Sequence, residues 1–171
     1  MSVTVNTVGE TRRSAVLPWI GTAVRLGLAA VWLLAGASKV GDLAASGRAV
    51  AAYEVMPYDV AKIVGAALPF VEITLGVLLL LGVATRLAAA VSAALLVVFV
   101  AGITSAWVRG LTIDCGCFGT GGQLPAGQNP SYGPELLRDL GFLALAGFLL
   151  VRPHTRISVD AMGAPRPEEE Q

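Results

Sequence analysis

Three long apolar runs constrain this chain more than any other feature of its sequence. They extend from about residue 17 to 37, 63 to 83 and 87 to 108, and only Arg25 and Glu72 interrupt them. A helix rises about 1.5 Å per residue, so roughly 20 residues cross a hydrocarbon core of about 30 Å. Only 14% of the residues are charged, against about a quarter in soluble domains. The sequence therefore predicts an integral membrane protein embedded in a lipid bilayer.

A fourth, shorter apolar run covers about residues 136–151 and crosses the bilayer only if residues 135–139 sit at the interface. The predicted fold is all-α, an antiparallel four-helix membrane bundle with helices at about 18–38, 61–83, 87–108 and 136–151. Only residues 84–86 separate the second helix from the third, which predicts a tight hairpin. A long Gly/Pro-rich loop, residues 109–134, holds both cysteines, and the tails 1–17 and 152–171 are predicted to be disordered.

The N-terminus also resembles a twin-arginine signal, with Arg12 and Arg13 before an apolar stretch that ends in the small residues 35–37. The stretch is long for a signal, however, and further apolar runs follow it. We therefore expect a retained first helix.

Basic residues favour the cytoplasmic side of short loops. Arg12 and Arg13 precede the first helix, and Arg86 lies in the predicted hairpin. An even number of spans then places both termini in the cytoplasm and the cysteine loop outside the plasma membrane, where disulfides persist.

The sharpest local motif is Cys115-Gly116-Cys117-Phe118-Gly119. Two thiols one residue apart can close a small, strained ring, and strained disulfides are the exchangeable kind. The pair can instead be a structural disulfide that shapes the loop. A metal site is the weakest alternative, because zinc takes four ligands and His154 is expected at the opposite membrane face; no metal is predicted.

Glu72 is the second chemical signal, because ionisable groups deep in a membrane are costly and usually paired. Counting from the predicted inner helix ends places Arg25 near its level, whereas Lys39 is too far away unless the helices are offset. An Arg25–Glu72 pair would either set the helix register or relay protons. Arg138 and Asp139 are predicted to pair or to line a mouth near the cysteine loop.

The sequence resembles the MauE/DoxX family of small four-helix membrane proteins over about residues 24–151. The matching segments are Arg25…Gly36-Ala37-Ser38-Lys39, Tyr53…Pro57, Pro69-Phe70-Val71-Glu72…Gly76 and Cys115-Gly116-Cys117-Phe118-Gly119. The cysteine motif, similar to that of the MauE branch, is the most specific of these matches.

The resemblance implies a redox-associated protein of the bacterial plasma membrane that works with a thioredoxin-like or DsbA-like partner outside the cytoplasm. In methylamine-utilising bacteria, MauE is tied to maturation of the disulfide-rich small subunit of methylamine dehydrogenase; the family name is no claim about substrate here. The bundle also resembles DsbB and vitamin K epoxide reductase, which pass electrons between thiols and quinone through two cysteine pairs. This chain has two cysteines, which excludes a two-pair relay. No cofactor is assigned, and quinone is the one that the resemblance suggests.

Three functions follow from these features. The first is thiol–disulfide exchange by Cys115 and Cys117 in the maturation of exported proteins. The second is a non-catalytic membrane scaffold for a redox partner, with a structural loop disulfide. The third and weakest is a small transporter or proton conductor built on Arg25 and Glu72. The net charge of zero points to no nucleic-acid partner, and the sequence leaves room for an oligomer.

Overall fold

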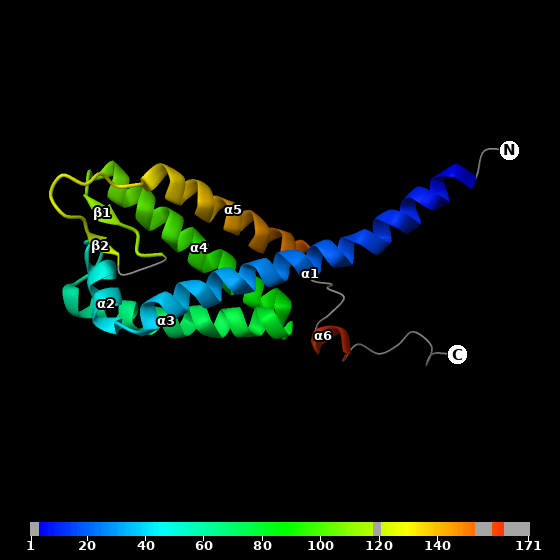
Figure 1. Ribbon diagram of the computed structural model, residues 1–171, viewed down its shortest axis with the longest axis horizontal. Helices are drawn as coiled ribbons and strands as arrows, with labels where there is room; N and C mark the ends of the chain where they lie inside the picture. Colours follow the sequence, from blue (N-terminus) through cyan, green and yellow to red (C-terminus); the bar gives the residue numbers. More distant parts are fainter. Residues whose placement is uncertain (1–3, 118–120, 153–158, 163–171) are drawn as a thin grey trace.

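The computed structural model describes residues 4–117, 121–152 and 159–162, and it describes side chains for 17–117, 121–152 and 159–160. The chain is mostly helical (Figure 1). The helices are α1 (Thr4–Val40), α2 (Leu43–Ala51), α3 (Tyr58–Leu81), α4 (Thr85–Val108), α5 (Tyr132–Val151) and α6 (Val159–Met162), and the strands are β1 (Ile113–Asp114) and β2 (Gly122–Gln123).

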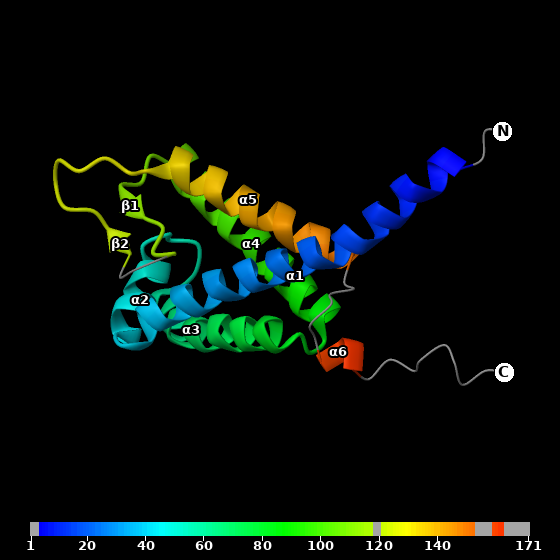
Figure 2. The same ribbon diagram turned by 45° about the vertical axis from the view of Figure 1, so that its right-hand side comes forward.

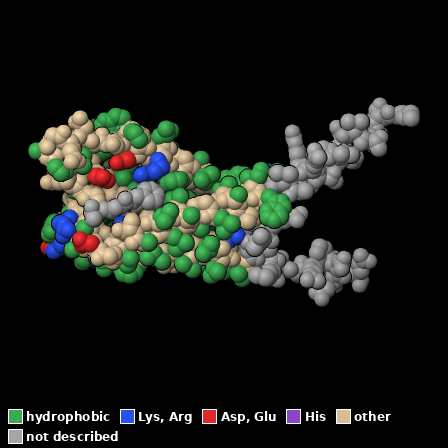
Figure 3. All heavy atoms as spheres, in the orientation of Figure 1, with side chains coloured by type: hydrophobic (Ala, Val, Ile, Leu, Met, Phe, Trp, Pro, Cys, Tyr) green, Lys and Arg blue, Asp and Glu red, His purple; other side chains and the backbone are tan. Residues whose placement is uncertain are grey.

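Three segments of the described chain are long and apolar enough to cross a membrane: Leu17–Val40 in α1, Tyr58–Leu81 in α3 and Thr85–Val108 in α4. Hydrophobic side chains cover the middle of the molecular face in Figure 3, whereas charged side chains gather mainly at its left end. A soluble protein would bury such helices, but here less than half of each apolar window is buried. The chain is a multi-pass membrane protein, as its hydropathy predicts.

The helix α5 has 20 residues and packs along α4. It carries Glu135, Arg138 and Asp139 in its first half, which separates it by composition from the three apolar segments. Its apolar second half contributes Ala146 and Leu149, both completely buried, to the core between α1, α3 and α4.

Two glycines bring α1 and α3 into close contact and set their register. A Cβ on Gly36 of α1 would lie 2.8 Å from the carbonyl oxygen of Pro69 and 2.6 Å from Ile73 Cγ1. A Cβ on Gly76 of α3 would lie 3.0 Å from the backbone nitrogen of Leu33. Small residues allow this close approach of helix backbones in membranes. The pairs also show that α1 and α3 run antiparallel, with Gly36 level with residues 69–73.

The connection between α3 and α4 is as tight as the sequence predicts. Gly82 ends α3 with a φ of +68°, in the left-handed region that glycine adopts without a Cβ penalty. The N–H of Gly82 donates to the carbonyl of Leu79, and the N–H of Val83 donates to that of Leu78. This is a Schellman-type helix end, which uses carbonyls that the helix itself leaves unpaired.

Asp160 of α6 caps the N-terminus of α4. Its carboxylate accepts the backbone N–H groups of Ala84 and Thr85, each at 2.9 Å. Hydrogen bonds from these groups, that of Thr85 first, lower the pKa of Asp160. The described part of the C-terminal segment therefore touches the bundle at the α3–α4 hairpin.

Several predicted boundaries differ from the structure. The helix α1 begins at Thr4, so most of the predicted tail 1–17 is helical. Hydropathy marks only the part of a helix that lipid surrounds, and a formed helix extends readily because each added residue gains a hydrogen bond. The predicted tail 152–171 includes α6, and its remaining residues from 153 to 158 and 163 to 171 lie outside the described part, as does His154.

The segment between the first two predicted helices and the loop 109–134 both contain regular structure. Residues 40–62 include α2, whose N-terminus is capped by the Asp42 carboxylate accepting the Ala45 N–H at 2.8 Å. The loop 109–134 includes the antiparallel pair β1–β2, in which Ile113 faces Gln123. Both elements are too short for an apolar run to reveal them.

The short elements and the N-terminal part of α1 lie at the two opposite ends of the molecule, and the long helices run between these ends. In Figures 1 and 2 the N-terminal part of α1 and the short α6 lie at one end, while α2, β1 and β2 lie at the other. The cysteine loop is therefore placed far from both ends of the described chain.

Replacing Gly36 by alanine should destabilise the protein by about 1–3 kcal/mol, because the added methyl group overpacks the contact with α3. Gly27→Ala is the matched control, since a Cβ there meets nothing within 4 Å; it should be neutral or stabilising by up to about 1 kcal/mol. Unfolding free energies in mixed detergent micelles measure both. Equal stability of the two variants would contradict the close α1–α3 approach.

Candidate functional site

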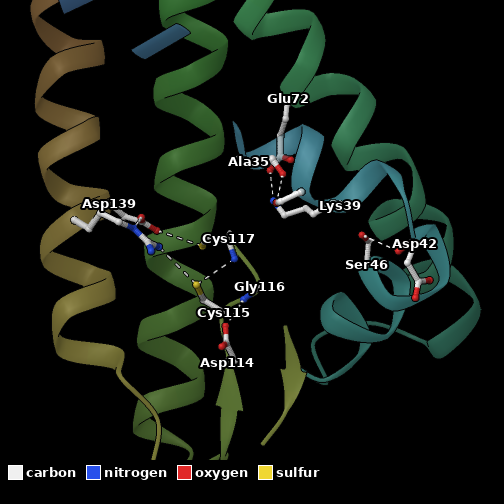
Figure 4. Close-up of polar contacts among 12 residues, drawn as sticks. Ala35, Lys39, Asp42, Ser46, Glu72, Asp114, Cys115, Gly116, Cys117 and Asp139 are labelled. Atoms are coloured by element: carbon white, nitrogen blue, oxygen red, sulfur yellow. Dashed lines mark hydrogen bonds and ion pairs between the residues drawn. The ribbon is translucent and has the colours of Figure 1, made fainter. Parts of the chain in front are cut away.

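Residues 115–117, which include both cysteines, follow β1 directly and form a turn (Figure 4). The Asp114 carboxylate accepts the backbone N–H of Gly116 at 2.9 Å. Gly116 has a φ of +67°, and a Cβ on it would lie 3.1 Å from the Cα of Gly121. The residue between the cysteines must therefore be glycine for both conformational and steric reasons. This turn brings Cys115 and Cys117, both free thiols, to the same side of the bundle.

Cys115 is surrounded by hydrogen-bond donors. Its Sγ accepts two hydrogen bonds, one from the backbone N–H of Cys117 at 3.3 Å and one from Nη2 of Arg138 at 3.6 Å. The pKa of Cys115 is lowered, first by a hydrogen bond from the Cys117 side chain and further by the Cys117 N–H and Arg138, although burial opposes the shift. Donors and a positive charge favour the thiolate.

Cys117 has the opposite protonation behaviour. Its Sγ lies 3.9 Å from Oδ2 of Asp139, at the outer limit of a sulfur hydrogen bond. The pKa of Cys117 is raised, because its hydrogen bond to Cys115 requires the proton, because it is buried, and because Cys115 and Asp139 place negative charge nearby. Cys115 therefore ionises first, and Cys117 keeps its proton.

The first turns of α5 supply the two charged side chains beside these thiols. Arg138 Nε lies 3.0 Å from Asp139 Oδ1, and Asp139 is only 2% exposed. The sequence analysis predicted this pair near the cysteine loop. In the structure Arg138 donates a hydrogen bond to Cys115, and Asp139 contacts the thiol of Cys117.

The buried carboxylate of Glu72 pairs with Lys39. Lys39 Nζ lies 2.6 Å from Glu72 Oε1, and the two side chains are 5% and 1% exposed. Figure 4 shows this pair on the opposite side of the cysteine loop from Asp139. Ion pairing is what allows two charges to remain buried at this position.

The predicted Arg25–Glu72 pair is wrong. Arg25 Nη1 donates instead to the carbonyl oxygens of Leu79 and Leu80, the latter at 2.9 Å. Gly36 lies level with Glu72, so Arg25, 11 residues earlier on α1, is displaced by roughly 16 Å along the axis at about 1.5 Å per residue. The prediction counted from hydropathy boundaries and could not include the offset that the glycine contacts impose. Lys39 lies one turn beyond Gly36 on the same face and reaches Glu72 easily.

Three residues near the thiols were not predicted as site residues. The Tyr53 hydroxyl donates to the Cys115 carbonyl at 3.2 Å, and burial raises the pKa of Tyr53. Ligand atoms of Asp114, Cys115 and Glu135 lie within 4.8 Å of one another. They could offer a metal three ligands, one fewer than structural zinc takes. The sequence analysis treated Glu135 only as a residue at the membrane interface. Tyr53 and Asp114 come to the thiols through the fold and the local turn, which the sequence analysis did not predict.

Two cavities meet at Cys117. The larger, about 200 Å³, is lined mainly by apolar side chains of α2, α3 and α4 together with Lys39, Tyr53 and both cysteines. The smaller, about 20 Å³, is lined by apolar residues together with Trp32, Glu72, Cys117 and Asp139. Both thiols thus border the larger apolar chamber, and Cys117 also borders a small, mainly apolar gap that Glu72 and Asp139 reach.

Comparisons with known proteins agree with the motif pattern. The family model described as methylamine utilisation protein MauE matches residues 17–152. A methylamine utilization protein MauE from Paracoccus denitrificans is 34% identical over 130 residues, which cover 75% of this chain and 67% of the relative. The DoxX part of the resemblance gains no support from these matches, and no solved structure matches the chain. The chain belongs to the MauE family.

Proposed function

We propose that this protein is a membrane thiol–disulfide exchange protein whose Cys115–Cys117 pair reacts with an extracytoplasmic thioredoxin-like or DsbA-like partner. The observation that carries the proposal is the asymmetry of the two thiols. Cys115 is the easily ionised sulfur, supported by Arg138, and Cys117 is the protonated one beside Asp139. An attacking thiolate next to a resolving thiol is the arrangement that exchange requires.

The exchange proceeds in two steps. The Cys115 thiolate attacks one sulfur of a partner disulfide, forms a mixed disulfide and releases the other partner sulfur as a thiolate. Cys117 then gives its proton to the Asp139 carboxylate and attacks Cys115 Sγ, which releases the second partner thiolate. The products are a Cys115–Cys117 disulfide and a reduced partner, and the reverse sequence oxidises the partner.

The proposal includes a four-span topology with α5 as the fourth span. Its charged residues lie at the cysteine-loop end, where the headgroup region can solvate them, and its apolar half joins the bundle core. Arg86 in the α3–α4 hairpin lies at the opposite end, and by the positive-inside tendency that end faces the cytoplasm. Both termini would then be cytoplasmic, and the cysteine loop would lie outside the plasma membrane.

The substrate we propose is the disulfide of an exported protein, reached through the redox partner. The relative from Paracoccus denitrificans is named for methylamine utilization, which is a statement about that protein. The proposal rests on the thiol pair, whose substrate is a disulfide and not an amine.

The alternative is a scaffold whose loop disulfide only shapes a docking surface. The loop is tied to the α2–α3 connection by the Tyr53–Cys115 hydrogen bond and by Arg109, which donates to the Tyr53 carbonyl at 2.7 Å. These contacts favour a loop of defined shape, as either function would need.

A Cys117→Ser variant should trap a mixed disulfide with its partner, because Cys115 can attack but no second thiol can resolve the product. Cys115→Ser should trap less, because burial and the neighbouring Asp139 carboxylate still raise the pKa of the remaining thiol once the Cys115 side chain is gone. Non-reducing electrophoresis followed by mass spectrometry identifies the captured protein. If neither variant captures a partner and the partner still co-purifies with the double serine variant, the scaffold function replaces this one.

Replacing Arg138 by glutamine should move the alkylation of Cys115 to higher pH. The arginine holds the pKa of Cys115 down, so its removal should raise the midpoint by roughly one pH unit. The measurement is the iodoacetamide rate against pH in a Cys117→Ser background, with Arg138→Lys as the charge-preserving control. An unchanged midpoint in Arg138→Gln would remove Arg138 from the mechanism.

The topology predicts which thiols an impermeant maleimide can reach in intact cells. Cys115 in the Cys117→Ser variant should be labelled from outside after mild reduction. A cysteine placed at Arg86, which is exposed, in a background without Cys115 and Cys117 should be labelled only after the membrane is permeabilised. The reverse pattern would invert the proposed orientation.

A further inference from the structure

The larger cavity lies against the reactive pair and opens toward lipid. Cys115 and Cys117 both line it. Its lining also includes Val64 of α3 and Val98 of α4, which are 42% and 63% exposed. Because α3 and α4 are apolar enough to span the membrane, an opening between them faces hydrocarbon. A ligand entering there would come from the bilayer.

The polar groups of this cavity are few and specific. Among the described residues that line it, Lys39 is the only charged one. Its ammonium group is buried and held by Glu72, and an ammonium group carries three donor hydrogens. An apolar chamber with one fixed cationic donor and two thiols suits a ligand that is apolar, has a carbonyl acceptor and can take electrons.

We propose that this cavity binds the ring of a lipid-soluble quinone, which oxidises the Cys115–Cys117 dithiol. A cavity of about 150 Å³ accommodates a benzene ring, so about 200 Å³ holds one substituted six-membered ring, with any tail leaving between α3 and α4. Lys39 donates to a ring carbonyl and stabilises the negative charge that develops there during reduction. The inference rests on the proposed thiol exchange, for which the quinone is the electron acceptor.

The reaction balances without another reagent. The Cys115 Sγ–Cys117 Sγ bond forms and two electrons pass to the ring, whose two oxygens gain two protons. Cys117 gives one of these protons, and the second comes from water and replaces the proton that Cys115 released when it ionised. Lys39 supplies one of these protons directly to the carbonyl that it contacts. It must then recover a proton from the thiol pair.

The smaller cavity provides a route for that proton. Its volume of about 20 Å³ is enough for one water molecule, which needs roughly 10–15 Å³ measured this way. Glu72 Oε2 and Trp32 Nε1 are buried and have no hydrogen-bond partner within the described part of the chain, and both residues line this cavity with Cys117 and Asp139. A water held by these groups passes a proton from Cys117, through Asp139, to Glu72 and Lys39.

The test uses the full chain, reduced, freed of reductant and kept anaerobic in lipid nanodiscs, with ubiquinone-1 as the probe. We expect one quinone to be reduced for each cysteine pair oxidised, measured by quinone absorbance and by an alkylation mass shift. Val98→Trp, at the opening, should slow the reaction by about tenfold to a hundredfold, since small misplacements of reacting groups cost that much. Val97→Trp is the matched control, because Val97 is exposed on the same helix and does not line the cavity.

A binding measurement separates this inference from the proposed function. Ubiquinone-1 should quench the tryptophan fluorescence of the Cys115→Ser/Cys117→Ser protein saturably. Binding without any partner captured by the Cys117→Ser variant would support the quinone site and overturn thiol exchange. Partner exchange with no quinone reduced would overturn the quinone site and leave exchange standing. Quenching abolished by added fatty acid, with no quinone reduced, would show that a lipid chain occupies the cavity and would also overturn it.

Discussion

The close approach of α1 and α3 at Gly36 and Gly76 is the contact on which the rest of the site depends. In a membrane there is little hydrophobic force between helices, so tight packing of small residues sets their positions. This contact places Lys39 next to Glu72 and leaves Arg25 at the far end of α3. A second close approach, where a Cβ on Gly65 would lie 2.5 Å from the Ser46 carbonyl oxygen, holds α2 against α3 and so forms one wall of the larger cavity.

The charged groups of the bundle are arranged around the thiols. The helix α5 brings Arg138 to Cys115 and Asp139 to Cys117, while α1 and α3 bring the Lys39–Glu72 pair to the other side of the loop. Positive charge beside one sulfur and negative charge beside the other give two chemically different thiols from a symmetric-looking motif. The buried ion pair then has a role beyond helix register, because its lysine borders the same chamber as the sulfurs.

Much of the architecture could be predicted from the sequence, and the errors have identifiable causes. Long apolar runs locate α1, α3 and α4, because segments of this length and hydropathy are stable when lipid surrounds them and not when water does. The helix α2 and the β1–β2 pair were not predicted. A 9-residue helix and two-residue strands are too short to produce an apolar run that would indicate them. Glu72 is buried in the structure, but its partner depended on a helix offset that composition does not encode.

The sequence by itself determined that the chain spans a membrane, that Cys115 and Cys117 are close enough to react with each other, and that Glu72 needs a partner. These follow from hydropathy, from the short Cys-Gly-Cys spacing and from the cost of burying a charge, all of which are local properties. Only the tertiary structure decided that Lys39 is that partner, that the two thiols differ in acidity and that they border an apolar chamber. Those features depend on distances between helices, which side chains far apart in the sequence set when they pack together.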